Sequence, residues 1–166
     1  MSSKYTRQLI LALLLLSTVS CFSQDWASTQ IDSIASIKFP ATPKDIPVGT
    51  NSELLASDEN GVYLAMAVKL EDYSISTGDS LSVFYADVVT GMQTSVKISE
   101  IQTKDFVFNG LHGLEVDYKL PENQQFARTR ILLLRGSLYS ISVITTNIEK
   151  LKSVTFAKFF GSFTVK

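Results

Sequence analysis

Apolar and polar residues alternate along much of this chain, a pattern that predicts β-strands with one buried face. In residues 34–39, the side chains of Ala35, Ile37 and Phe39 share one face. Residues 62–70 carry apolar side chains on both faces, so we expect a central strand there. Similar patterns predict further short strands at residues 46–48, 53–56, 96–101, 105–108, 114–119, 126–134, 138–145 and 162–165.

Two segments change to the spacing of an amphipathic helix. After Asp79 and Ser80, which can cap a helix, apolar residues recur at intervals of three and four up to Met92. A second helix is predicted from its cap, Asn147, to about Phe159. Consecutive strands joined by short turns pair antiparallel, and two helices can cover a sheet. The predicted fold class is therefore α+β: a mostly antiparallel β-sheet sandwiched by helices, an α/β/α sandwich.

One hairpin can be predicted residue by residue. If residues 121–124 form its loop, the flanking strands place Asp117 opposite Arg128 and Glu115 opposite Arg130 on one face. The other face of both strands is then apolar. Each pair of opposite charges stabilises a sheet by roughly 0.2 to 1 kcal/mol. Charge and hydrophobicity therefore agree on one register.

The face that carries these charges becomes apolar farther along the same strands. With residues 136–137 as a two-residue turn, Leu132 would lie opposite Ile141. A helix over only the apolar half would leave a polar surface beside it, which we call the charged shelf. It is interpreted first as internal salt pairs and second as a recognition surface for a partner or an anionic ligand. The charged shelf consists of Glu115, Asp117, Arg128 and Arg130.

The N-terminal residues have the order of a secretory signal: Lys4 and Arg7, then an apolar run, then small polar residues. The apolar run would extend only about 12 Å as a helix, far less than the roughly 30 Å of a membrane core. No transmembrane segment is therefore predicted. We expect a signal peptide at residues 1–23, a lead-in segment at 24–33 and a single globular domain at 34–166.

Two processing routes compete for the residues around Cys21. Cys21 and Ser23 suit ordinary cleavage before Gln24, while residues 18–21 resemble a bacterial lipobox, in which the cysteine is lipidated. Thr18 stands where that motif usually has leucine, so ordinary cleavage is preferred. The protein is expected to be exported, periplasmic or extracellular, with a membrane-anchored lipoprotein as the alternative. Membrane contact is expected only if Cys21 is lipidated.

Composition excludes several kinds of chemistry. The chain has 15 basic and 16 acidic residues and no long basic run, so no nucleic-acid partner is expected. Cys21 is the only cysteine, and His112, in a predicted turn, is the only histidine, which excludes a disulfide, a thiolate metal site and a histidine triad. The acidic pairs at 58–59 and 71–72 lack the spacing of a calcium loop, and no phosphate loop is present. No catalytic, cofactor-binding or metal-binding residue is predicted.

Several turn and core motifs resemble those of one family. They are residues 39–43 (FPATP), Gly110 and Gly113 before Glu115, Arg128 and Arg130 with Gly136, Leu138 with Tyr139, and residues 159–163 (FFGSF). Across residues 34–163 the chain resembles the PsbP-like superfamily, most closely its small exported bacterial members. The resemblance implies an antiparallel sheet sandwiched by helices. The best-known relatives, a subunit of the photosynthetic oxygen-evolving complex and a factor that binds the GTPase Ran, are binding proteins without a catalytic centre.

The predicted function is that of an exported accessory or binding domain of the bacterial cell envelope, not an enzyme. Its expected partner is an envelope protein or a small ligand, which the sequence does not identify. Two alternatives remain open: an envelope protein anchored by lipid on Cys21, and a hydrolase that depends on carboxylates. The hydrolase is disfavoured because arginines opposite Glu115 and Asp117 would keep both carboxylates ionised and deprive the mechanism of its acid.

Overall fold

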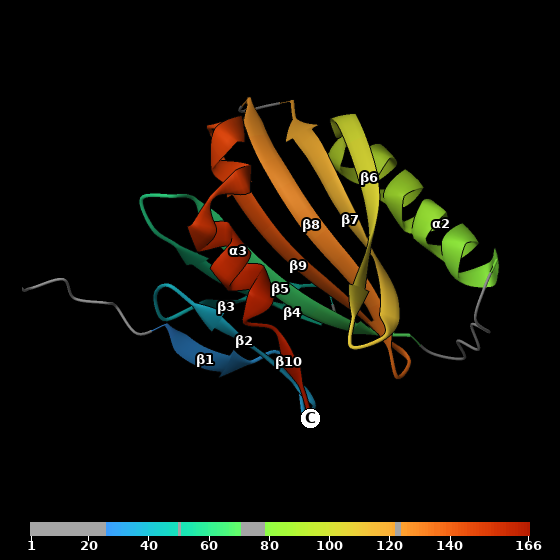
Figure 1. Cartoon of the computed structure of the whole chain (residues 1–166), viewed down its shortest axis with the longest axis horizontal. Coiled ribbons are helices and arrows are strands. Elements are labelled where there is room, and N and C mark those ends of the chain that lie inside the picture. The colour runs from blue at the N-terminus through green and yellow to red at the C-terminus, as the bar shows by residue number, and fades with distance from the viewer. Residues whose placement is uncertain (1–25, 50, 71–78, 122–123) are drawn as a thin grey trace, which may run out of the picture.

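The computed structural model describes residues 26–49, 51–70, 79–121 and 124–166. Within them the backbone forms two β-sheets, two α-helices and one 3-10 helix (Figure 1). None of these helices is long and apolar enough to cross a membrane. The signal peptide predicted at residues 1–23, including Cys21, lies outside the described residues.

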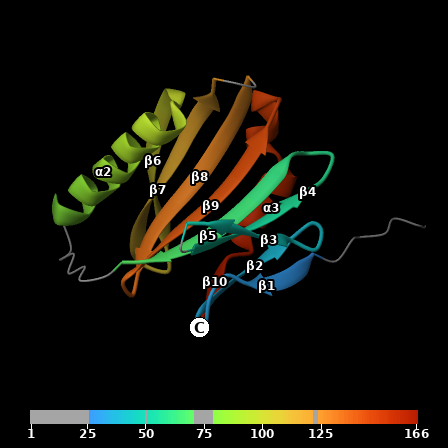
Figure 2. The same cartoon turned by 180° about the vertical axis from the view of Figure 1, so that it is seen from behind.

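Seven strands form the larger sheet, in the order β3-β4-β5-β9-β8-β7-β6, with every neighbouring pair antiparallel (Figure 2). β5 lies between β4 and β9, which confirms the central position predicted from its two apolar faces. The two strands expected at 96–101 and 105–108 are a single strand, β6, whose pairing is irregular between Ser99 and Gln102. The seven strands are β3 (Lys44–Val48), β4 (Asn51–Ser57), β5 (Val62–Lys69), β6 (Ser99–Phe108), β7 (Leu111–Leu120), β8 (Gln125–Leu134) and β9 (Ser137–Thr145).

A second sheet of three strands joins the beginning and the end of the described chain. Its order is β1-β2-β10, and both pairings are antiparallel. The sequence pattern predicts no strand at β1. Trp26, just before β1, packs edge-on against Tyr63, with ring centroids 5.8 Å apart, so this segment contributes to the packing of the larger sheet. The three strands are β1 (Ala27–Gln30), β2 (Ala35–Phe39) and β10 (Thr164–Val165).

The first predicted helix is confirmed, whereas the second is broken in two. The helices are α2 (Asp79–Val96), the 3-10 helix η1 (Ile148–Lys152) and α3 (Val154–Gly161). Ser153 makes the break. Its amide donates to Lys150 O, which ends η1, and its hydroxyl accepts from the amide of Phe156 at 3.3 Å, which caps α3. The prediction of one continuous helix over 147–159 is wrong because serine competes well as the cap of a new helix.

The predicted α/β/α sandwich is also wrong. The described structure is mostly antiparallel β-sheet, and no layer of helices covers the whole of either face of the larger sheet. On one face, Ile37 and Phe39 of β2 join the core beside α3. On the other face, Phe84 and Tyr85 of α2 pack over β7 and β8 (Figure 2). The prediction is wrong because it assumes that helices alone cover the larger sheet. In the structure, the three-stranded sheet covers part of one of its faces.

Aromatic rings fill the core between the two sheets. Tyr63 of β5 and Tyr139 of β9 are fully buried, as are Phe156 and Phe159 of α3. The rings of Tyr63 and Phe159 meet edge to face, with centroids 5.1 Å apart. Phe160, the next residue of α3, is also buried. These contacts fix α3, and η1 before it, on one face of the larger sheet (Figure 1).

The β7–β8 hairpin has the predicted register. Asp117 lies opposite Arg128, and Glu115 lies opposite Arg130. Both pairs stand on the face that η1 and α3 share, because alternate residues of one strand point to the same side. This confirms the predicted register of the two strands, while residues 122–123 of the predicted loop lie outside the described residues.

The register predicted for the next hairpin is wrong by two residues. Arg135 and Gly136 form the turn, with φ angles of 50° and 74°, the left-handed geometry of a tight hairpin. Leu132 therefore lies opposite Tyr139 rather than Ile141. A shift of two residues keeps each side chain on its predicted face. The apolar continuation of the charged shelf is thus present, and Leu132 is part of the core.

Candidate functional site

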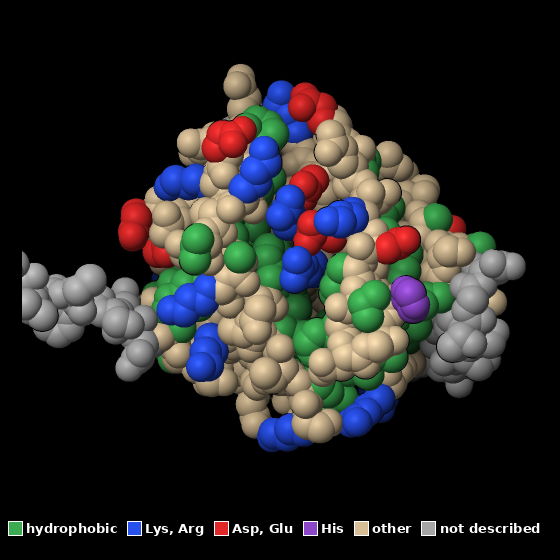
Figure 3. All heavy atoms as spheres, viewed as in Figure 1, with side chains coloured by type: hydrophobic (Ala, Val, Ile, Leu, Met, Phe, Trp, Pro, Cys, Tyr) green, Lys and Arg blue, Asp and Glu red, His purple; other side chains and the backbone are tan. Residues whose placement is uncertain are grey.

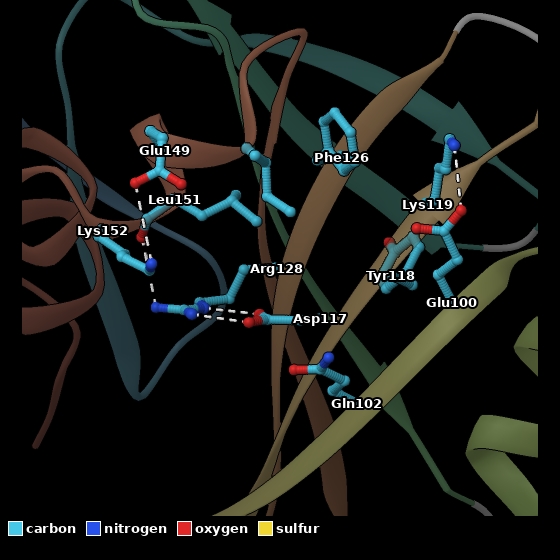
Figure 4. Close-up of a pocket in the computed structure, with 11 residues that line it drawn as sticks. Glu100, Gln102, Asp117, Tyr118, Lys119, Phe126, Arg128, Glu149, Leu151 and Lys152 are labelled. Atoms are coloured by element: carbon cyan, nitrogen blue, oxygen red, sulfur yellow. Dashed lines mark hydrogen bonds and ion pairs between the residues drawn. The ribbon is translucent and has the colours of Figure 1, made fainter.

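The charged shelf is held together by a bidentate ion pair. Arg128 Nε donates to Asp117 Oδ1 and Arg128 Nη2 donates to Asp117 Oδ2, both at 2.7 Å (Figure 4). The third nitrogen, Nη1, donates to the carbonyl oxygen of Leu151 at 3.3 Å. All three guanidinium nitrogens of Arg128 are therefore engaged, and the β7–β8 hairpin is tied to η1.

Glu115 links the two arginines of the shelf. It accepts a hydrogen bond from Arg130 Nε at 2.7 Å and lies 3.4 Å from Arg128 Nε. Its side chain is 11% exposed, against 21% for Arg128 and 32% for Arg130. The hydrogen bond from Arg128 to Asp117 raises the pKa of Arg128, and this effect outweighs burial, which acts to lower it. The shelf is thus a partly buried network in which two positive and two negative groups balance.

A hollow of about 220 Å³ opens beside the shelf, between the ends of β7 and β8 and η1 (Figures 3 and 4). We call it the η1 groove. Opposite charges pair across its rim: Lys119 Nζ lies 3.0 Å from Glu100 Oε1. The Lys119 ammonium also lies 5.9 Å from the ring centroid of Phe126. The groove is lined by apolar Phe126, Ile148 and Leu151 and by the charged residues Glu100, Asp117, Lys119, Arg128, Glu149 and Lys152.

A smaller pocket of about 140 Å³ lies at the opposite end of the shelf, between β6 and the end of α3. Arg130 stands at its edge, between two aromatic rings. The guanidinium carbon is 5.1 Å from the ring centroid of Phe106 and 4.7 Å from that of Phe160. We call this the phenylalanine pocket. Its lining includes Phe106, Phe108, Leu132, Ile141, Phe160 and Phe163.

None of the other candidate residues that the structure describes lines either hollow. His112 is exposed and lies in β7 rather than in a turn, and its carbonyl oxygen accepts a hydrogen bond from the Tyr85 hydroxyl at 2.9 Å. Asp58 accepts from the amides of Asn60 and Gly61 and so stabilises its own turn. The acidic pair at 71–72 lies outside the described residues. Among the described residues, no group of three or more His, Cys, Asp or Glu side chains is placed to hold a metal ion.

Sequence reasoning missed most of the apolar lining of the two hollows. Lys119 and Phe126 could have been predicted as lining residues, because the predicted register places them opposite each other on the face of the charged shelf. Ile148 and Leu151 were not, because their position depends on how η1 folds back onto β8. The stacking of Arg130 on Phe160 likewise depends on a tertiary contact with α3.

Comparison with known proteins gives a fold but no family. No family model matches the sequence, and no curated protein matches it. The solution structure of cyanobacterial PsbP (CyanoP) from Synechocystis sp. PCC 6803 is similar, with a TM-score of 0.59 and 16% identity over 90% of this chain and 99% of that one. The crystal structure of the Saccharomyces cerevisiae Ran-binding protein Mog1p gives a TM-score of 0.46 and 11% identity, over 85% and 96% of the two chains. The likeness to CyanoP shows that this chain has a PsbP-like fold.

Proposed function

We propose that this protein is an exported, non-enzymatic binding domain that holds its partner in the η1 groove. The observation that carries the proposal is the groove itself, in which an apolar wall is surrounded by charged side chains. An apolar centre with a polar rim is the usual anatomy of a protein-binding surface. The occupant we infer is an envelope protein that inserts an apolar side chain against Phe126 and Ile148.

Ile148 is the residue of the groove that a partner can reach most directly. Its side chain is 50% exposed, whereas Leu151, three residues later in η1, is part of the core. Exposure of a large apolar side chain to water is unfavourable in free energy. Arg128 holds the backbone of η1 through Leu151 O, so the position of Ile148 is fixed by the charged shelf. In this proposal the shelf is the support of the binding surface, and Ile148 is its anchor point.

The export part of the proposal is supported by the order of residues at the N-terminus. Lys4 and Arg7 precede an apolar run, and small residues follow at Cys21 and Ser23. Cleavage before Gln24 would release the domain outside the cytoplasm, and lipidation of Cys21 would tether the same domain to a membrane. The groove serves either form.

Capture of partners by the tagged full-length protein tests the proposal. The protein carries an affinity tag after Lys166 and is expressed in a bacterial host, and bound envelope proteins are identified by mass spectrometry. Ile148→Glu should reduce capture about tenfold or more, because it places a charge in the apolar part of the groove. Val154→Glu is the matched control, since Val154 is 84% exposed and lies outside the groove. Partners that both variants retain equally would show that the groove is not the binding surface.

A further inference from the structure

The phenylalanine pocket is shaped for one small ring. Its floor is formed by Leu132, Ile141 and Phe163, which are 2%, 4% and 5% exposed. Phe106 from β6 and Phe160 from α3 stand over it as walls. The volume of about 140 Å³ is close to the roughly 150 Å³ of an apolar protein cavity that takes up benzene. Aromatic walls favour an aromatic occupant through edge-to-face contacts.

Arg130 differs from Arg128 in what its guanidinium does. Arg128 uses all three nitrogens for hydrogen bonds within the protein. Arg130 uses only Nε, which donates to Glu115, and within the described residues Nη1 and Nη2 have no hydrogen-bond partner. The stacking of the guanidinium between Phe106 and Phe160 fixes its plane. The side chain is therefore oriented in advance, with its two outer nitrogens open to an acceptor at the edge of the pocket.

The local charge favours an anion over a neutral acceptor. Within the charged shelf, Glu115 and Asp117 balance the charges of Arg128 and Arg130, and Asp117 is bound edge to edge by Arg128. Lys104 of β6 pairs with Glu115 in the strand register, so it adds a positive group on the same face. A guanidinium edge binds a carboxylate in bidentate geometry, with two parallel hydrogen bonds.

We propose that the phenylalanine pocket binds a small aryl carboxylate. The carboxylate accepts hydrogen bonds from Nη1 and Nη2 of Arg130, and the aromatic ring lies in the pocket against its buried floor. The pocket is separate from the η1 groove, so this site neither depends on the partner proposed above nor decides whether that partner exists.

Titration of the full-length protein with 3-phenylpropionate, followed by NMR chemical shifts and calorimetry, tests the site. We expect saturable binding with shifts at Phe160 and Ile141, and at least about tenfold weaker binding of the neutral isostere 3-phenylpropanamide. Arg130→Gln should weaken 3-phenylpropionate binding by about tenfold or more, while Arg135→Gln, in the exposed β8–β9 turn, should not change it.

A second variant keeps the test valid if Arg130→Gln does not fold. Lys104→Glu reverses a charge on the face of the charged shelf at an exposed position of β6, and it should weaken binding of the carboxylate by about threefold or more. Lys44→Glu on β3, an exposed position at the opposite edge of the larger sheet, is its matched control. Equal binding of acid and amide, or no saturation at about 10 mM ligand, would overturn the proposal. Binding of a peptide with a C-terminal phenylalanine, but not of 3-phenylpropionate, would also overturn it in favour of a protein ligand.

Discussion

Arg128 and Asp117 face each other across β7 and β8 and share two hydrogen bonds of 2.7 Å. The same guanidinium reaches Leu151 O, so a single side chain connects the hairpin to η1. Two contacts of Arg128 therefore form the wall of the η1 groove. The contact with Asp117 on the neighbouring strand could be predicted from the sequence, whereas the contact with Leu151 of η1 could not.

The first prediction concerns this pair. Arg128→Glu should lower the free energy of unfolding by about 2 kcal/mol, because it sets like charges opposite each other and frees Leu151 O. The cost is smaller than for a fully buried pair, since the shelf is partly exposed to solvent. Exchange of both charges, in Asp117→Arg with Arg128→Glu, should restore about half of the loss. Urea unfolding of the two single variants and the double variant measures the coupling, and additive effects would contradict a direct pair.

The second prediction concerns Asp32, which connects the three-stranded sheet to β9. Its carboxylate accepts from the Tyr139 hydroxyl at 2.6 Å and from the amides of Ile34 and Ala35. Burial acts to raise the pKa of Asp32, but these hydrogen bonds outweigh it and hold the pKa below its usual value. Asp32 therefore adds stability above the unfolded-state pKa of about 3.9, and that stability is lost as the pH falls through the lower folded-state pKa.

Asp32→Asn should accordingly lower the free energy of unfolding by about 1 to 2 kcal/mol at pH 7. The difference between the variant and the wild type should shrink as the pH falls below about 4. Denaturant unfolding between pH 7 and pH 2 measures both effects. Asp87→Asn, at an exposed position of α2, is the control and should leave stability unchanged. A constant difference across this pH range would show that Asp32 does not titrate as inferred.

How far the sequence could predict this molecule depends on the range of the interactions concerned. The β7–β8 register follows from charges and apolar residues on neighbouring strands, and it is correct to the residue. The β8–β9 register depends on which residues form the turn. The sequence predicts the turn at residues 136–137, but Arg135 takes a left-handed conformation and the turn lies at residues 135–136. Glycine at position 136 alone does not reveal that its neighbour also has a positive φ.

The features that the sequence could not predict are those that depend on distant contacts. The sequence predicts a strand at residues 162–165, and β10 lies within it, but it does not predict the pairing of β10 with β2, more than a hundred residues earlier in the chain. The break at Ser153 lets α3 place Phe156, Phe159 and Phe160 in the core, where a continuous helix would follow a different course. For the same reason the shelf could be located from the sequence, but the two hollows beside it could not.

The third prediction concerns Phe160. Its ring is 6% exposed and packs on Phe159, with centroids 5.8 Å apart, and under the guanidinium of Arg130. Phe160→Ala should lower the free energy of unfolding by about 3 to 5 kcal/mol, because it opens a cavity and removes the ring that orients Arg130. Val154→Ala on the same helix should change stability by less than about 0.5 kcal/mol, since that side chain is 84% exposed. Thermal unfolding of both variants makes the comparison, and a loss below about 1 kcal/mol for Phe160→Ala would contradict the packing.

The fourth prediction concerns processing. The proposed function includes export, and on that proposal the mature protein should begin at or near Gln24, because Cys21 and Ser23 supply the small residues that cleavage requires. Intact mass of the protein recovered from the envelope fraction measures the start. Cys21→Ala should then be processed at the same place. A diacylglyceryl adduct on Cys21, absent from Cys21→Ala, would instead establish the lipidated form.

The last prediction follows from the position of His112, the only histidine of the chain. Its side chain is exposed in β7, and the hydrogen bond at this residue is made by its backbone, whose carbonyl oxygen accepts from Tyr85. Alanine retains that carbonyl, so His112→Ala should change the free energy of unfolding by less than about 0.5 kcal/mol. Since the proposed binding surfaces lie elsewhere, the variant should also capture partners as the wild type does. A stably folded His112→Ala protein that loses capture or a cellular phenotype would contradict the binding-domain proposal. So would a purified wild-type domain that turns over a substrate and stops when one polar side chain is removed.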